Sequence, residues 1–139
     1  MIDCTDGAAT ASTSTAEAAA PSWASVTKEQ QRQMVAVYFA KVYHLSWHSY
    51  MHRSSFMHAF EQDTASPLVV KSVCVAASVF MQDQRRAARL WARELERDLG
   101  DTLSSPTIDS LIALVNLTVI DMANGNNAGM WSRAALAVR

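Results

Sequence analysis

The sequence has few of the residues on which most enzyme motifs depend. It contains four glycines and two cysteines, and it has no GxxxxGK[ST], GxGxxG or GxSxG pattern. Phosphate-cradling loops and a nucleophilic serine elbow are therefore not predicted. Asp109 and Asp121 would lie roughly three turns apart on one helix, too far to act as a carboxylate pair. The sequence therefore predicts that the chain is not an enzyme.

Cysteine pairs, a strong net charge and membrane-length apolar runs are also lacking. Cys4 and Cys74 lie far apart, so no disulfide is predicted and a reducing intracellular compartment is favoured. The net charge of −1 argues against a protein that holds nucleic acid through its overall field. The longest apolar run, residues 67–81, contains Lys71 and is too short to span a bilayer. We expect a soluble globular protein without membrane contact.

Alanine, serine and threonine dominate residues 1–26, which contain no basic residue. Such a composition cannot bury enough apolar surface to offset the entropy lost on ordering. No signal-peptide or transit-peptide pattern is present in it. We predict that residues 1–26 are a disordered leader or linker and that residues 27–139 form the ordered domain.

Hydrophobic periodicity predicts helices and no strand in residues 27–139. The first helix begins with a capping box of Thr27 and Gln30, and it is expected to end near His44. A short second helix is expected to start with Ser54 or Ser55 as its cap. Cys74 and the polar pair Asn116 and Thr118 are expected inside the helix bundle. Cys74 belongs to the expected helix of residues 67–81, and Asn116 and Thr118 belong to the expected fifth helix.

The remaining helices have clearer start and stop signals. Ser66-Pro67 starts the third helix, residues 67–81, whose apolar circumference requires neighbours on most sides. Its β-branched residues make a central strand the competing interpretation, and the length of the run favours the helix. Residues 84–99 form an amphipathic helix ending at Gly100, Ser105-Pro106 starts a fifth that stops at Asn124-Gly125, and a sixth opens near Asn127. The sequence thus predicts an all-α protein, an irregular bundle of about six helices that is the N-terminal portion of a larger helical domain.

All four histidines lie in residues 38–60, and three of them recur every fourth residue. On one helix, His44, His48 and His52 would share a face and could bind zinc. No acidic residue lies between Lys41 and Phe60 to orient the rings, and the segment lacks a clean helical period. We therefore favour histidines at a helix end and in a packed loop, with no metal site. The aromatic side chains expected to anchor this loop and the short helix are Trp47, Tyr50 and Phe56.

Arginines recur along residues 84–99 and could contact phosphates. Glu94, Glu96 and Asp98 dilute their charge, and no aromatic residues are interleaved with them on the same face of the helix. We expect a solvated, salt-bridged helix face. The arginines are Arg85, Arg86, Arg89, Arg93 and Arg97.

Six patterns follow one another along the chain: a helix ending in YFxxVY, an aromatic passage ending in HRxxF, a Ser-Pro helix rich in small apolar residues, an arginine-rich helix with Ala and Trp, a second Ser-Pro helix running into a Gly/Asn turn, and a final WxxxAxAVR. In this order and spacing they resemble the middle homology region of fungal-specific transcription factors, the regulatory domain typified by xylanolytic activators. No single motif is specific to that family. The matching residues, structural rather than catalytic, are Tyr38, Phe39, Val42, His52, Arg53, Phe56, Pro67, Trp131, Ala135, Ala137, Val138 and Arg139.

The resemblance implies a regulator of transcription in the nucleus. Family members usually carry a separate N-terminal cluster of two zinc ions and six cysteines that binds DNA. Two cysteines cannot form that cluster, so no cofactor is expected in this chain, and DNA would be contacted only through a cluster missing from it. The implied partners are a second copy of the chain, as a homodimer, or other transcription proteins.

Two departures from the family bear on how much of the domain is present. Ala135 stands where the family most often has glycine, and the family continues into further helices beyond the position of Arg139. The chain would then be a truncated part of the regulatory domain. The alternative is a stand-alone helical binding module for a hydrophobic ligand or a partner helix.

Overall fold

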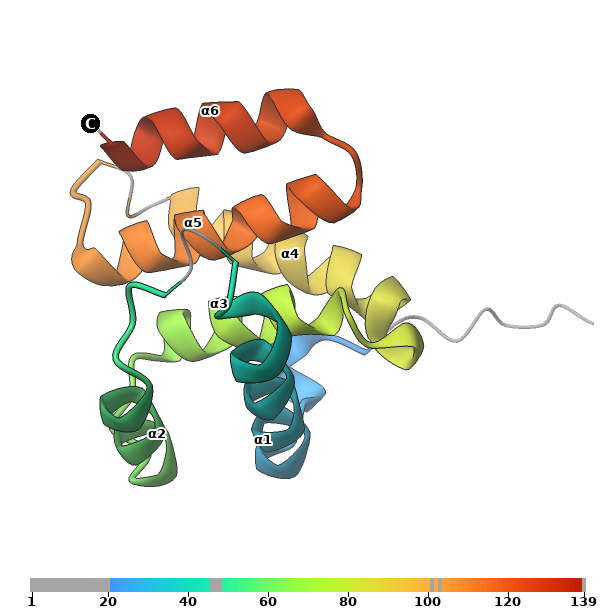
Figure 1. Cartoon of the computed structure of the whole chain (residues 1–139), viewed down its shortest axis with the longest axis vertical. Helices are drawn as coiled ribbons and strands as arrows, with labels where there is room; N and C mark the ends of the chain where they lie inside the picture. The colour runs from blue at the N-terminus through green and yellow to red at the C-terminus, as the bar shows by residue number, and fades with distance from the viewer. Residues whose placement is uncertain (1–20, 46–48, 101, 103, 139) are drawn as a thin grey trace, which may run out of the picture.

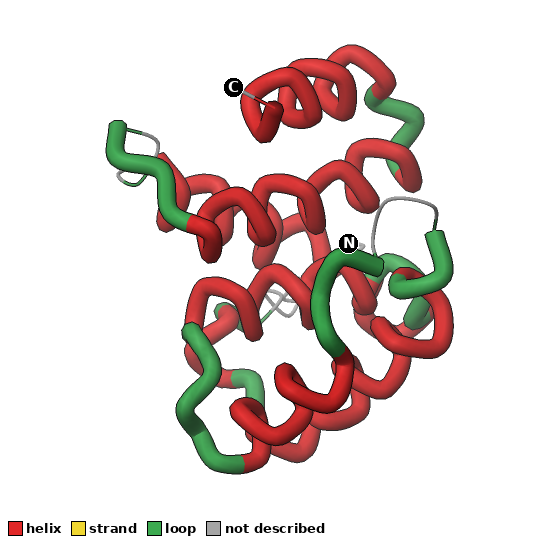
Figure 2. Tube along the Cα trace, turned by 60° about the vertical axis from the view of Figure 1, so that its left-hand side comes forward, coloured by secondary structure: helices red, strands yellow, loops and turns green. Residues whose placement is uncertain are grey.

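The computed structural model describes residues 21–45, 49–100, 102 and 104–138. In this part of the chain six α-helices pack together and no strand occurs, which confirms the all-α prediction (Figure 1). Figure 2 shows the same arrangement with short loops between the helices. The helices are α1 (Lys28–Val37), α2 (Arg53–Glu61), α3 (Pro67–Ser78), α4 (Arg85–Gly100), α5 (Ile108–Ala123) and α6 (Asn127–Val138), with helical turns η1 (Trp23–Ser25), η2 (Tyr38–Val42) and η3 (Gln82–Gln84).

The central helix of the bundle is α3, which contacts α1, η2, α4 and α5. Every residue from Lys71 to Ser78 is buried, so the predicted need for neighbours on most sides is confirmed. The Ser-Pro start is also confirmed, because Ser66 holds the cap position and Pro67 is the first helical residue. The helix ends at Ser78, before the predicted end at residue 81.

The first helix starts as predicted, with reciprocal hydrogen bonds between Thr27 and Gln30. It continues into the π-helical turn η2, in which the amide of Tyr43 donates to the carbonyl of Tyr38 at 2.9 Å. The wider turn allows the adjacent Tyr38 and Phe39 both to be buried. The predicted end near His44 is confirmed.

The start of α2 differs from the prediction. Its cap is His52, whose Nδ1 accepts a hydrogen bond from the backbone amide of Ser55 at 3.4 Å. The prediction of Ser54 or Ser55 as the cap is wrong, because the neutral imidazole supplies the acceptor that a serine oxygen would otherwise provide. Both serine hydroxyls instead contact the same ring nitrogen.

The start of α5 also differs from the prediction, because its cap is Thr107 and not Ser105. Thr107 is the cap, and its hydroxyl accepts from the amide of Ser110 at 3.1 Å while the Ser110 hydroxyl accepts from the amide of Thr107 at 2.8 Å. The predicted start at Ser105-Pro106 is therefore wrong. The helix begins two residues later, where the reciprocal Thr107–Ser110 pair satisfies free amides of the first turn. The predicted stop is confirmed, since Gly125 adopts a left-handed φ of 69°.

Residues 21–26, which the sequence assigns to the leader, lie against α4. The indole of Trp91 donates a hydrogen bond to the carbonyl of Pro21 at 2.8 Å, and the ring of Trp23 meets that of Trp91 edge-on with centroids 5.6 Å apart. The amide of Trp23 donates to Glu94 at 3.2 Å. Packing against the bundle thus begins before Thr27, whereas residues 1–20 lie outside the described residues.

The outer layer of the bundle is α6, which lies along α5 (Figure 1). It begins at Asn127, as predicted, and none of its described residues is buried. In the part of the chain that the structure describes, no helix has the length and apolarity that crossing a bilayer requires.

Candidate functional site

A buried asparagine joins three separate parts of the bundle. Oδ1 of Asn116 accepts hydrogen bonds from the hydroxyls of Tyr38 at 3.0 Å and Tyr50 at 3.1 Å. Its Nδ2 donates to the hydroxyl of Ser72 at 3.0 Å. Asn116 is fully buried, so these bonds replace those it would make with water. The prediction of polar contacts within the bundle is confirmed.

The tyrosines bonded to Asn116 act as neutral donors. Burial raises the pKa of Tyr38 to about 12. Desolvation of its hydroxyl end also raises the pKa of Tyr50, although the residue as a whole is 44 % exposed. Both phenols therefore keep their protons near neutral pH and hold helices together.

Some of the residues that carry the family resemblance form an aromatic group. Around η2, the ring centroids of Tyr38 and Phe39 are 5.3 Å apart, and those of Phe39 and Phe56 are 5.8 Å apart. Val42 is buried beside them. The guanidinium of Arg53 lies 5.4 Å from the centre of the Phe39 ring. This group packs α2 against η2.

The other matching residues lie elsewhere. His52 caps α2 and Pro67 starts α3. Trp131 is 69 % exposed on α6, where Ala135 and Val138 are exposed and Ala137 is half-buried. Arg139 lies outside the described residues. The structure therefore does not bring the α6 residues together with the aromatic group around η2.

The described histidines of the series His44, His48 and His52 do not form part of a metal site. His44 follows η2 and is exposed, His52 is engaged as a helix cap, and His48 lies outside the described residues. Among the residues with described positions, no three His, Cys, Asp or Glu side chains converge on a point that could hold a metal ion. Of the three expected anchors, Phe56 is buried, Tyr50 bonds to Asn116, and Trp47 lies outside the described residues.

The zinc cluster implied by the resemblance finds no fit in this chain. Cys74 is fully buried in α3, with its sulfur 3.8 Å from the carbonyl oxygen of Gln31. Burial raises the pKa of its thiol, which disfavours the thiolate that zinc requires. The sequence prediction of Cys74 as a small buried apolar side chain is confirmed.

The carboxylates of α4 pair with cations on other helices. Nζ of Lys71 lies 2.7 Å from Asp98 and 3.7 Å from Glu94. Arg133 of α6 bonds to Glu96 and, at 2.5 Å, to Asp121 of α5. The sequence could not show this cross-helix pairing, because it depends on which helix faces end up opposite each other.

The arginines of α4 are exposed, as predicted, but most of them are not salt-bridged. Among the described residues, no ion pair is formed by Arg85, Arg89, Arg93 or Arg97. The predicted salt-bridged face is therefore wrong for these four, because the carboxylates of α4 itself are engaged with Lys71 and Arg133.

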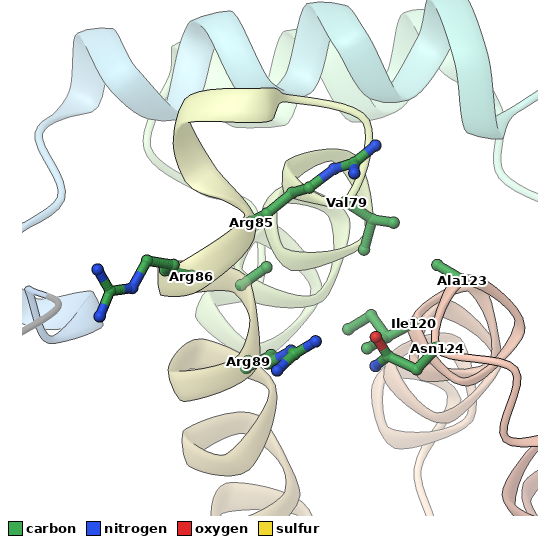
Figure 3. Close-up of a pocket in the computed structure, with 8 residues that line it drawn as sticks. Val79, Arg85, Arg86, Arg89, Ile120, Ala123 and Asn124 are labelled. Atoms are coloured by element: carbon green, nitrogen blue, oxygen red, sulfur yellow. The ribbon is translucent and has the colours of Figure 1, made fainter.

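Two of these arginines line a cavity of about 360 Å³ between the end of α3, the start of α4 and the end of α5. Figure 3 shows the side chains of Arg85 and Arg89 extending towards the side that holds Val79, Ile120 and Asn124, while Arg86 extends the opposite way. Sequence periodicity gave no sign of this cavity, because its walls come from three helices.

Among the described residues, several apolar side chains of α5 and α6 are exposed. Two shallow cavities of about 240 and 250 Å³ adjoin there and share Val115 and Ala137. Ile108 is 77 % and Val138 is 87 % exposed. We call this surface the α5–α6 face. Its residues are Ile108, Leu111, Val115, Trp131, Ala137 and Val138.

No family model matches the sequence, and neither a curated protein nor a solved structure matches it. The resemblance to the fungal regulatory domain thus rests on the residues that carry it.

Proposed function

We propose that the chain is a regulatory domain of a fungal zinc-cluster-type transcription factor, that it acts in the nucleus through protein contacts, and that it carries out no catalysis. In this proposal residues 27–139 are part of a larger helical domain. DNA is contacted only through a separate zinc cluster, and the partners are a second copy or other transcription proteins.

The observation that carries this proposal is the α5–α6 face. Large apolar side chains that adjoin on a surface usually mark a site of protein contact, because leaving them in water is unfavourable. Trp131 lines one of the two cavities and is 69 % exposed, and tryptophan is among the residues that contribute most to binding energy at interfaces. A helical protein surface laid against α5 and α6 would cover these side chains.

The buried polar groups support a structural rather than a catalytic role. Asn116 bonds to Tyr38, Tyr50 and Ser72 and thereby links α5 to η2, to the segment before α2 and to α3. Each of these groups has its partner inside the bundle. Tyr50 also lines one cavity of the α5–α6 face, but its hydroxyl is engaged with Asn116 and the carbonyl of Ile112.

The alternative, a stand-alone module for a hydrophobic ligand, is less well supported than a protein partner. The two cavities of the α5–α6 face have volumes of about 240 and 250 Å³. Sites for small molecules usually enclose roughly 300–1,000 Å³ and bury most of the ligand. A partner helix can lie across both cavities at once, which a small ligand cannot.

A tethering experiment tests the proposal. The chain is fused to an unrelated DNA-binding protein that lacks regulatory activity, and transcription of a reporter with the matching site is measured in a fungal cell. We expect the fusion to change reporter transcription relative to the DNA-binding protein alone at equal nuclear amounts. Identical transcription from the two proteins would contradict the proposal.

A further inference from the structure

The cavity at the start of α4 combines a cationic rim with an apolar floor. Its rim carries the guanidinium groups of Arg85 and Arg89 and the amide of Asn124 (Figure 3). Its floor is formed by Val79, Ala88, Ile120 and Ala123. Ala88 and Ile120 are 4 % and 7 % exposed, so the floor is continuous with the packed interior.

The charges of Arg85 and Arg89 are not balanced by a carboxylate within the described part of the chain. Arg85 and Arg89 are one helical turn apart on the same side of α4, where like charges repel. Neither forms an ion pair with a described carboxylate. The nearest acids along the same helix are used elsewhere, since Glu94 and Asp98 bind Lys71 and Glu96 binds Arg133.

Two other arginines of the bundle show what a balanced site looks like here. Arg133 contacts two carboxylates, those of Glu96 and Asp121. Arg32 likewise contacts Glu29 and Glu61. Arg85 and Arg89, in contrast, lie beside a cavity and contact no described carboxylate. An anion bound in the cavity would balance their charge.

We propose that this cavity binds a small organic anion, in which a phosphate or carboxylate group is attached to an apolar body. Guanidinium groups bind such oxyanions through two parallel N–H···O bonds, which a lysine cannot reproduce. The volume of about 360 Å³ lies within the range usual for small-molecule sites. The apolar floor holds the body of the ligand, and the Asn124 amide donates to the oxyanion. This site does not depend on the proposed role in transcription.

The competing explanation is that the two arginines only interact with the C-terminal ends of the neighbouring helices α3 and α5. Val79 directly follows α3, and Ala123 ends α5, so the last carbonyls of both helices present partial negative charge near this place. In that case the arginines stabilise the bundle and bind no ligand. Binding and stability measurements separate the two explanations.

The test titrates the full chain, labelled with ¹⁵N and ¹³C-methyl, with phenyl phosphate, benzoate and inorganic phosphate at constant ionic strength. We expect saturable shifts of the Asn124 side-chain amide and of the Val79 and Ile120 methyl groups. Phenyl phosphate should bind about threefold or more tightly than inorganic phosphate, because its ring covers the apolar floor. Benzoate and phenyl phosphate together distinguish a carboxylate from a phosphate as the preferred group.

The matched variants are R85Q/R89Q and R93Q/R97Q, which remove the same charge from the same helix. R85Q/R89Q should weaken phenyl phosphate binding about tenfold or more, the usual effect of losing a charge-assisted hydrogen bond, whereas R93Q/R97Q should leave it within about twofold. If R85Q/R89Q fails to fold, R85K/R89K replaces it and should also weaken binding. The proposal is overturned if no probe gives saturable shifts, if both pairs weaken binding equally, or if inorganic phosphate binds as tightly as phenyl phosphate.

Discussion

The hydroxyl of Tyr38 donates a hydrogen bond of 3.0 Å to Oδ1 of Asn116, a residue 78 positions further along the chain. The same asparagine donates to Ser72 in α3. One side chain therefore fixes the positions of η2, α3 and α5 relative to one another. Because all three groups lie in the interior, their loss is expected to be costly.

Replacing Asn116 with leucine is expected to lower the free energy of unfolding by about 2–4 kcal/mol, because buried hydroxyls lose their acceptor. Urea-induced unfolding measures this change. Tyr50→Phe is the control: it removes a hydroxyl that donates to Asn116 and to the carbonyl of Ile112 from a residue that is 44 % exposed, and it should lower stability by about 1 kcal/mol or less. Equal stability of N116L and the wild type would show that the polar junction does not hold the helices.

Stability is expected to fall as the pH rises from about 10 to about 12. Burial raises the pKa of Tyr38 from 10.0 to about 12, so in this window the folded chain binds more protons than the unfolded chain. The free energy of unfolding therefore decreases with pH, and for Tyr38 the loss approaches roughly 2–3 kcal/mol above the folded-state pKa. The raised pKa values of Tyr50 and Cys74 act in the same direction.

The variant Tyr38→Phe isolates the contribution of Tyr38 to this pH dependence. Its unfolding free energy, measured in urea at several pH values between 9 and 11.5, should decrease less steeply than that of the wild type. Parallel profiles for the two proteins would mean that the Tyr38 hydroxyl titrates normally in the fold.

Removing the ring of Trp23 is expected to detach residues 21–26 from α4. Trp23→Ala should lower the free energy of unfolding by about 1–2 kcal/mol through the lost ring contact with Trp91. Exchange of the Trp91 indole proton, which bonds to the Pro21 carbonyl, should become faster in hydrogen-exchange NMR. Trp131→Ala is the matched control, because Trp131 is 69 % exposed, and it should leave both quantities unchanged.

Two helical glycines should respond in opposite ways to alanine. A Cβ at Gly100 would meet nothing within 4 Å, so Gly100→Ala is expected to raise stability by roughly 0.5 kcal/mol. A Cβ at Gly129 would lie 2.2 Å from Nδ2 of Asn126, whose Oδ1 accepts from the Gly129 amide at 3.0 Å. Displacing Asn126 removes that bond, so Gly129→Ala should give no gain or a loss. Thermal unfolding of the two variants measures the difference. An equal gain in stability for Gly100→Ala and Gly129→Ala would contradict the close approach of Asn126 to Gly129.

The helices with strong local signals could be predicted from the sequence. Pro67 at a helix start, Gly125 at a stop and the Thr27–Gln30 pair each act through neighbours within a few residues. The run of buried residues in α3 also predicts a central position, since a helix without a polar face must be covered.

Features that depend on tertiary contacts could not be predicted. Trp23 gives no sign in the sequence that Trp91 will lie beside it. His52 replaces the expected serine cap of α2. Its imidazole reaches the amide of Ser55 only in a suitable rotamer, which the sequence does not reveal. The cavity beside Arg85 exists only once three helices meet, and the α5–α6 face is visible only when burial is known.

The effect of the α5–α6 face on transcription tests the central claim most directly. In the tethered reporter, the variant W131S/V138S removes two exposed apolar side chains of the face. The control F80S removes an apolar side chain outside the face, which follows α3 and is 46 % exposed. The account predicts that the regulatory effect of the fusion falls about fivefold or more in W131S/V138S, as for loss of an interface hot spot, and persists in F80S at equal nuclear amounts. Equal regulation by W131S/V138S and the wild type would contradict it.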